Sequence, residues 1–184
     1  MEPLAGQIRG YAWGSRTAIA ALQGRPVPAP GPEAELWLGA HPDLPSSTVE
    51  GPLDRRIAAD PAGLLGDAVL AEFGPRLPYL LKVLAAAEPL SLQAHPDTAR
   101  ARQRYAAGDP NYRDACHKPE LLVAVEEFDA LCGFRPPALA AGQLAELGVP
   151  ALQPVVAALE TADLRGAVTS LLCWPEEDRA AVVG

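Results

Sequence analysis

Residues 91–95, SLQAH, place three polar side chains at alternate positions directly after a long apolar stretch. In a β-strand, residues two apart point to the same face, so Ser91, Gln93 and His95 would share one face. An imidazole is a common zinc ligand, and an amide oxygen is a rarer one. Gln93 and His95 are therefore candidate metal ligands. The alternative is a histidine that hydrogen-bonds a turn where the strand ends.

A second polar pair occurs in residues 117–121, HKPEL. Lys118 and Glu120 are two residues apart, and Pro119 favours an extended backbone at Lys118. Glu120 opens the apolar run LLVAV, where a buried carboxylate without a partner would be costly. A metal or a cation would offset that cost. Alternatively, Glu120 is a solvated carboxylate at the edge of a strand.

The two patterns carry more information together than apart. Gln93, His95 and Glu120 offer nitrogen and oxygen donors for a divalent metal, with Ser91 and Lys118 beside them. A metal next to a lysine suits a sugar phosphate, because the metal binds hydroxyl and carbonyl oxygens and the cation balances the phosphate charge.

Two further stretches hold polar or aromatic residues in apolar surroundings. Lys82 lies within YLLKVLA, where it either reaches the same pocket or extends its amine to solvent along an apolar surface. Residues 35–43, ELWLGAHPD, are typical of a strand that ends in a turn, with Glu35, Trp37 and His41 on one face. We interpret Trp37 as a core residue.

Composition limits the classes of function. The chain has 184 residues and a net charge of −8, which disfavours nucleic acid or an anionic membrane as partner. The three cysteines are widely spaced without a CxxC pair, so neither a disulfide framework nor a thiolate zinc site is indicated, and a reducing cytoplasm fits best. No apolar run is long enough to cross a membrane, and no signal peptide is visible.

The elements that position these residues are short strands and turns in the first two-thirds of the chain. The pattern predicts a strand within 35–43 that ends in a turn, strands near 79–85, 89–95 and 119–126, and helices over 60–74 and 96–108. From residue 137 to the end the spacing is helical. We therefore expect two domains, 1–135 and 136–184.

Four stretches carry a family likeness: YAWGS (11–15), AELWLGAHPDLPS (34–46), LPYLLKVLAAAEPLSLQAHPD (77–97) and HKPELLVAVEEFDALCGFRP (117–136). In order and approximate spacing they resemble type I phosphomannose isomerases. The resemblance implies a mainly β fold, namely a cupin (jelly-roll) β-barrel with an inserted α-helical domain, and one zinc ion per active site.

The resemblance also implies residue roles. Gln93, His95 and Glu120 match three zinc ligands of the family. Ser91 and Lys82 match positions that line the sugar-phosphate pocket, and Lys118 would stabilise developing charge during catalysis. The implied reaction interconverts mannose 6-phosphate and fructose 6-phosphate by proton transfer between C1 and C2 through a cis-enediol. Neither the general base nor the oligomeric state is assigned.

The sequence departs from the family pattern near its end. The fourth zinc ligand of the family is a histidine that follows the helical domain, and its catalytic arginine lies later still. We therefore expect this chain to be an N-terminal fragment with an incomplete barrel, poorly stable and largely inactive alone.

Two other functions are compatible with parts of the pattern. A metal-dependent oxygenase of the cupin class is disfavoured, because such enzymes use more histidines than Gln93 and His95 supply. A non-catalytic cupin-type module that binds sugar phosphates without a full metal site is the main alternative, and its zinc content would distinguish it.

Overall fold

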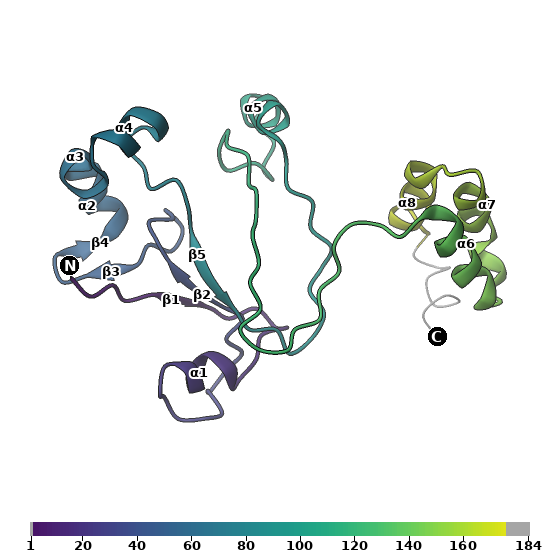
Figure 1. Cartoon of the computed structure of the whole chain (residues 1–184), viewed down its shortest axis with the longest axis horizontal. Coiled ribbons are helices and arrows are strands. Elements are labelled where there is room, and N and C mark those ends of the chain that lie inside the picture. Colours follow the sequence, from purple (N-terminus) through teal and green to yellow (C-terminus); the bar gives the residue numbers. More distant parts are fainter. Residues whose placement is uncertain (1, 176–184) are drawn as a thin grey trace. The chain divides into compact units, whose positions relative to one another are not determined.

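The computed structural model describes residues 2–175 of the chain. The chain divides into two compact units, Met1–Pro119 and Glu120–Gly184, and each is considered by itself (Figure 1). Among the helices of the described part, none has the length and apolar character needed to cross a membrane.

A three-stranded antiparallel sheet organises the first unit. It contains β1 (Gln7–Arg9), β2 (Glu35–Leu38) and β5 (Leu81–Leu84), in the order β1-β2-β5. The register places Trp37 of β2 opposite Gln7 on one side and Lys82 on the other. Because side chains alternate along a strand, the central strand divides its residues between two faces of different character.

One face of this sheet is apolar and forms the core of the unit. Leu36 of β2 packs with Ile8 and Val83 from the flanking strands, and α1 (Ala18–Leu22) adds the fully buried Ile19. Gly14 of the YAWGS stretch lies so close to Ala34 that a Cβ atom would come within 2.5 Å of the Ala34 nitrogen, so only glycine fits there. The other face carries Arg9, Glu35, Trp37 and Lys82.

Short elements connect β2 to β5 along the chain. The two-stranded pair β3 (Ser47–Thr48) and β4 (Gly51–Pro52) leads into α2 (Leu53–Ala59), α3 (Pro61–Leu65) and α4 (Asp67–Phe73). The prediction of a single helix over 60–74 is wrong, because Gly66, with φ of 77°, separates α3 from α4. Asp60 caps α3 by accepting a hydrogen bond from the Gly63 N–H.

The helix predicted over 96–108 is present as α5 (Thr98–Ala106). Its first turn is capped by the Asp97 carboxylate, which accepts a hydrogen bond of 2.7 Å from the Arg100 N–H. The strand predicted near 79–85 is confirmed as the shorter β5.

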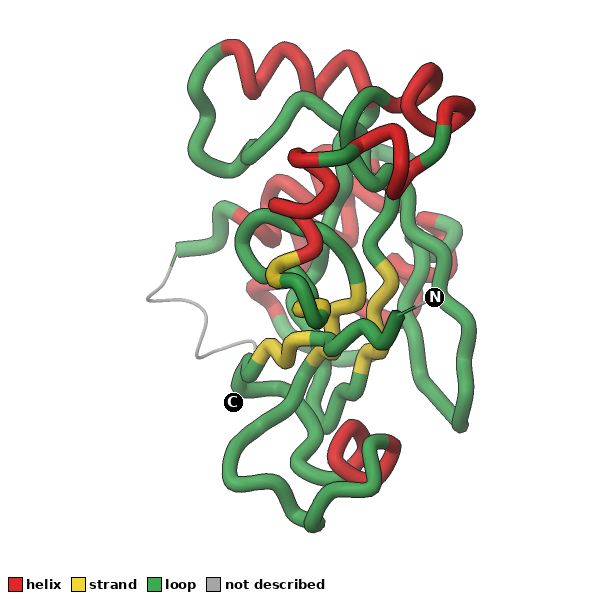
Figure 2. Tube along the Cα trace, turned by 90° about the vertical axis from the view of Figure 1, so that its left-hand side faces the viewer, coloured by secondary structure: helices red, strands yellow, loops and turns green. Residues whose placement is uncertain are grey.

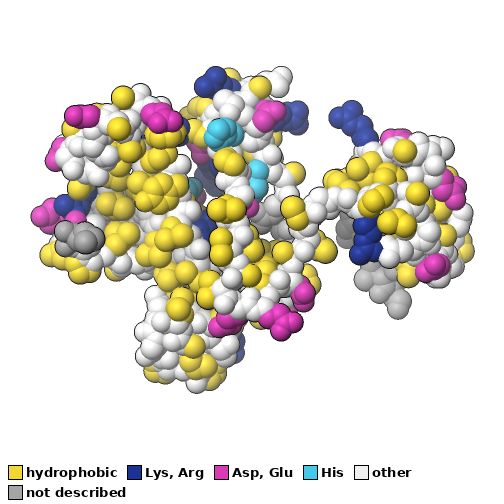
Figure 3. All heavy atoms as spheres, in the orientation of Figure 1, with side chains coloured by type: hydrophobic (Ala, Val, Ile, Leu, Met, Phe, Trp, Pro, Cys, Tyr) yellow, Lys and Arg dark blue, Asp and Glu magenta, His cyan; other side chains and the backbone are white. Residues whose placement is uncertain are grey.

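Two of the expected strands do not form. Residues 89–95 and 119–126 pair with no strand in the described part of the chain, and long loops separate the strands and helices there (Figures 1 and 2). A strand requires a hydrogen-bonded neighbour, and without one its apolar side chains stay in solvent. Leu121 and Val125 of the second unit are each 91% exposed. Hydrophobic side chains are also widespread on the face of the first unit that Figure 3 shows.

The expectation of a mainly β chain is consequently not confirmed. Helices hold more residues than strands, and the described residues form a three-stranded and a two-stranded sheet rather than a closed barrel.

The second unit is helical between Pro137 and Leu172, as predicted. It contains α6 (Pro137–Glu146), a 3₁₀ turn η1 (Pro150–Leu152), α7 (Gln153–Glu160) and α8 (Leu164–Leu172). Its core comprises Ala141, Val155, Val156, Leu159 and Ala167. The helical pattern predicted for residues 176–184 lies outside the described residues.

A buried serine closes the loop that follows β2. The Ser46 hydroxyl is fully buried, accepts a hydrogen bond from the Gly39 N–H (3.0 Å) and donates one to the Trp37 carbonyl (3.3 Å). It therefore fixes the backbone on both sides of the turn that contains His41.

Replacing this hydroxyl should destabilise the first unit. Ser46→Ala leaves the Gly39 N–H buried without that acceptor, so we expect the free energy of unfolding to fall by about 1–3 kcal/mol. Chemical denaturation measures this change. The matched control is Ser47→Ala, since Ser47 is exposed; equal losses in both variants would contradict the role of the buried hydroxyl.

Candidate active site

The polar face of the sheet is built around a buried carboxylate. Glu35 is only 8% exposed, and its Oε2 accepts a hydrogen bond of 2.6 Å from the indole N–H of Trp37. Its Oε1 lies 3.7 Å from the Lys82 Nζ. The lysine amine is also 5.1 Å from the centre of the Trp37 ring. Glu35, Trp37 and Lys82 thus form one connected group, which we call the β2 polar cluster.

Two more side chains surround the indole. The Arg9 guanidinium carbon lies 4.6 Å from the Trp37 ring centre, within the range of a cation–π contact. The imidazole of His41 meets the same indole edge-on, with ring centres 4.9 Å apart. Arg9 and Lys82 come from the strands on either side of β2, so cations from both flanking strands approach this aromatic ring.

His41 connects this face to the later part of the unit. Its Nδ1 accepts a hydrogen bond from the Asp43 N–H (3.2 Å), which leaves Nε2 to carry the proton of the neutral ring. Burial lowers the pKa of His41 below its ordinary value. Asp43 opposes this shift, whereas the positive charge of Lys118 adds to it, so Lys118 lies within electrostatic range of His41.

A cavity of about 270 Å³ lies among residues 94–118. Its polar and titratable lining residues are His95, Asn111, Tyr112, Asp114, Cys116 and Lys118. The Lys118 Nζ lies 3.7 Å from Asp114 Oδ2. A hydrogen bond of 2.8 Å between Thr98 and the imidazole of His117 ties the start of α5 to the returning chain. This contact brings the residues around His95 beside those around Lys118.

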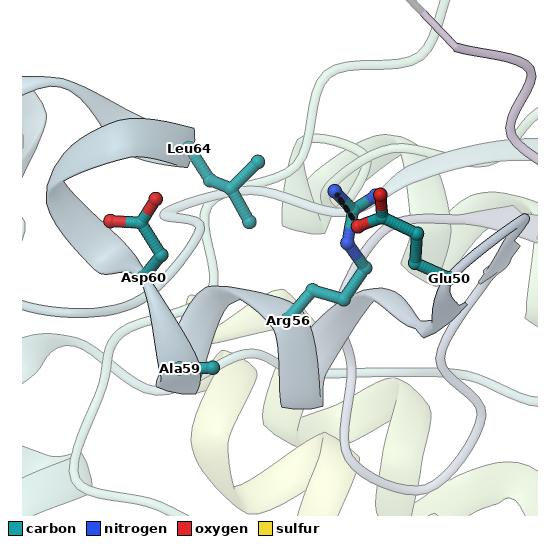
Figure 4. A pocket seen from close by; sticks show the side chains of 5 residues that line it. All are labelled: Glu50, Arg56, Ala59, Asp60 and Leu64. Atoms are coloured by element: carbon teal, nitrogen blue, oxygen red, sulfur yellow. Dashed lines mark ion pairs between the residues drawn. The ribbon is translucent and has the colours of Figure 1, made fainter.

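A second cavity, of about 230 Å³, has a structural explanation. Arg56 of α2 lines it and forms an ion pair of 2.7 Å with Glu50 (Figure 4). Arg56 also contacts Glu2. The basic residue that lines this cavity is therefore already neutralised by two carboxylates, so we assign no function to it.

The structure brings some of the predicted site residues together. His95 and Lys118 line the same cavity, and Lys82 lies on the sheet face with Glu35. Ser91 and Gln93 are exposed in the loop before α5 and are not among the residues lining the cavity. Glu120 is the first residue of the second unit. Within residues 2–175, no group of three or more His, Cys, Asp or Glu is placed to hold a metal ion.

The sequence pattern did not predict the contacts that three residues of this region make, namely Trp37, Glu35 and Arg9. Trp37 is indeed buried, at 7% exposure, but it is also the centre of the contacts with Arg9, Lys82 and His41. The alternation of Glu35 and Trp37 placed both on one face and could have indicated a carboxylate that binds the indole. No pattern in the sequence pointed to Arg9.

Comparison with known proteins identifies the family of the chain. The family model for the catalytic domain of type I phosphomannose isomerases matches residues 1–137. The chain belongs to this family. The matched part includes the β2 polar cluster and the cavity that His95 and Lys118 line.

Individual relatives agree with the family model. The chain is 39% identical to the mannose-6-phosphate isomerase of Escherichia coli, over 97% of this chain and 46% of that protein. It is 42% identical to the Salmonella typhimurium enzyme, over 73% of this chain and 38% of that protein. The chain therefore spans less than half the length of these curated relatives.

Solved structures show the same fold. A mutant of phosphomannose isomerase from Salmonella typhimurium superimposes with a TM-score of 0.85 and 35% identity, covering 98% of this chain and 49% of that chain. A structure of the Salmonella enzyme bound to its substrate and a zinc atom superimposes with a TM-score of 0.78 and 36% identity, covering 98% of this chain and 50% of that one.

The lowered pKa of His41 predicts a specific pH dependence. An unfolded histidine titrates near pH 6.5, above the folded value, so the unfolded state binds more protons as the pH falls through this range. The contribution of His41 to stability is thus fully present above about pH 6.5 and is lost as the pH falls through the folded pKa.

We expect an NMR titration to place the pKa of His41 below about 6.5. His41→Asn keeps an acceptor for the Asp43 N–H, so it should show a smaller loss of unfolding free energy between about pH 7 and about pH 5. Identical losses in the wild type and the variant would contradict the assignment.

Proposed function

We propose that this chain is part of a zinc-dependent aldose–ketose isomerase that interconverts mannose 6-phosphate and fructose 6-phosphate. The observation that carries the proposal is the presence of His95 and Lys118 in one cavity, within the region matched by the family model. An imidazole beside an ammonium group supplies a metal ligand and a partner for an anionic substrate.

Zinc would be held by Gln93, His95 and Glu120, each of which offers a nitrogen or oxygen donor. The donor types fit zinc, but three ligands do not complete the usual tetrahedral set, so we propose that a fourth ligand lies outside this chain. A bound zinc ion would polarise the oxygen atoms of the substrate.

The remaining roles concern charge. Lys118 would stabilise negative charge that develops on a substrate oxygen, and Lys82 and Ser91 would bind the sugar phosphate. Support for Lys82 comes from its exposure: its side chain is 33% exposed although it pairs with Glu35, so its amine stays accessible to an anion. An ammonium group binds phosphate as a compact charge with three donors.

We also propose that turnover requires residues beyond this chain, so that the 184 residues alone are inactive and poorly stable. The exposed apolar side chains of Leu121, Val123 and Val125 support this proposal, because such a row is suited to pairing and burial. The domain boundary near residues 135–136 is supported by the start of α6 at Pro137. A cytoplasmic location is supported by three free cysteines.

A non-catalytic module that binds sugar phosphates is the second candidate. It stays a candidate because Gln93, His95 and Glu120 alone do not complete a tetrahedral zinc site. Such a module would bind the sugar phosphate without holding zinc.

Neutralising Lys118 should weaken substrate binding. Lys118→Gln removes a charge-assisted contact of about 1.5–3 kcal/mol, so we expect the dissociation constant of fructose 6-phosphate to rise roughly tenfold or more. Isothermal titration calorimetry measures it. Arg102→Gln is the matched control, since it removes one positive charge from the exposed side of α5. Equal weakening in both variants would indicate only a general effect of net charge.

Zinc binding separates the two candidate functions. We expect the chain to bind zinc and His95→Ala to lose most of that affinity, whereas His117→Ala retains it, because His117 bonds Thr98 instead. Metal content after dialysis against a defined zinc concentration measures this. A wild-type chain that binds fructose 6-phosphate but holds no zinc would favour the binding module.

A further inference from the structure

We propose that Glu35 is a positioning residue, which together with the Trp37 indole holds the Lys82 amine in one orientation toward the phosphate group of the substrate. This inference rests on the proposed function for the identity of the ligand. The orientation of Lys82 itself rests on contacts within the first unit.

The Glu35 carboxylate is held by a different partner at each oxygen. Oε2 accepts the hydrogen bond from the Trp37 N–H, and Oε1 faces the Lys82 Nζ. A carboxylate that is 8% exposed needs such partners to offset its lost hydration. Since the indole fixes one oxygen at 2.6 Å, the other oxygen has a defined position and can direct a third group.

Lys82 is restrained from three sides. The backbone register places it directly opposite Trp37, and its amine lies 5.1 Å from the centre of the indole ring. The ion pair with Glu35 adds the third restraint. A free lysine has a long flexible stem with many rotamers, so these contacts remove freedom that substrate binding would otherwise have to remove.

The ligand class follows from the charges. The Lys82 ammonium group has three N–H donors, and one carboxylate oxygen does not occupy them all. Glu35 also cancels much of the local positive charge, so it would not strengthen phosphate binding by charge alone. Its contribution would be the direction in which the remaining N–H groups point, which suits a phosphate monoester with several acceptor oxygens.

The chain is well suited to a test because Lys82 and Lys118 are its only lysines. Acylation by a limiting amine-reactive ester, quantified by peptide mass spectrometry, reports on each amine separately. In Glu35→Gln the amide oxygen can still accept from Trp37, but the ion pair is lost. We expect Lys82 to react about fivefold faster in this variant, with Lys118 unchanged as the internal reference.

Glu33→Gln is the matched control. Glu33 is equally buried, at 8% exposure, but pairs with Arg25 instead of a lysine. Trp37→Phe is a second test variant, which removes the N–H donor and keeps an aromatic ring, and it should change Lys82 in the same direction. Unchanged Lys82 reactivity in Glu35→Gln and Trp37→Phe, or an equal change in Glu33→Gln, would overturn the proposal.

Binding of fructose 6-phosphate is a second readout, for which a charge role and a positioning role of Glu35 predict opposite changes in affinity. If Glu35 acted only through its charge, Glu35→Gln would bind the anion more tightly. Positioning predicts weaker binding, by about fivefold. Tighter or unchanged binding would overturn the positioning role. A wild-type chain that binds no fructose 6-phosphate would instead contradict the proposed function, and Lys82 acylation would still show whether Glu35 pairs with the amine.

Discussion

The central strand β2 has to satisfy two opposite requirements on its two faces. Leu36 must be buried against Ile19, whereas the neighbouring positions Glu35 and Trp37 place a carboxylate and an indole on the reverse side. The hydrogen bond between these two side chains makes the second arrangement possible, because it gives the buried carboxylate a donor. Lys82, Arg9 and His41 all contact the same indole, so the polar face depends on this one interaction.

The loop after β2 is also held in place by hydrogen bonds. Ser46 fixes both ends of the turn that contains His41, and His41 lies within electrostatic range of Lys118. Lys118 in turn lines a cavity with His95, whose segment is held by the contact between Thr98 and His117. Hydrogen bonds therefore order the turn that contains His41 and, separately, the segments that carry His95 and Lys118.

Local signals predicted the parts of the fold that depend on local physics. The helix over 96–108 and the alternation of β2 were readable from residue types, and so was the helical spacing after residue 137. The same reasoning was wrong for 89–95 and 119–126, because strand formation depends on a partner elsewhere and not on apolar content alone. Within the site, His95 and Lys118 were foreseen as neighbours, but the contacts of Glu35 and Arg9 with Trp37 depend on strand register, which no local pattern reveals.

The most direct test of this account is a two-dimensional ¹H–¹⁵N NMR titration of the 184-residue chain with fructose 6-phosphate in the presence of zinc. We predict that the Trp37 indole N–H and the amides of Lys82, His95 and Lys118 shift together and saturate with one dissociation constant. Shifts confined to other regions, such as the cavity beside Arg56, or no saturable shifts at all, would contradict the claim that this sheet face and cavity form a sugar-phosphate site.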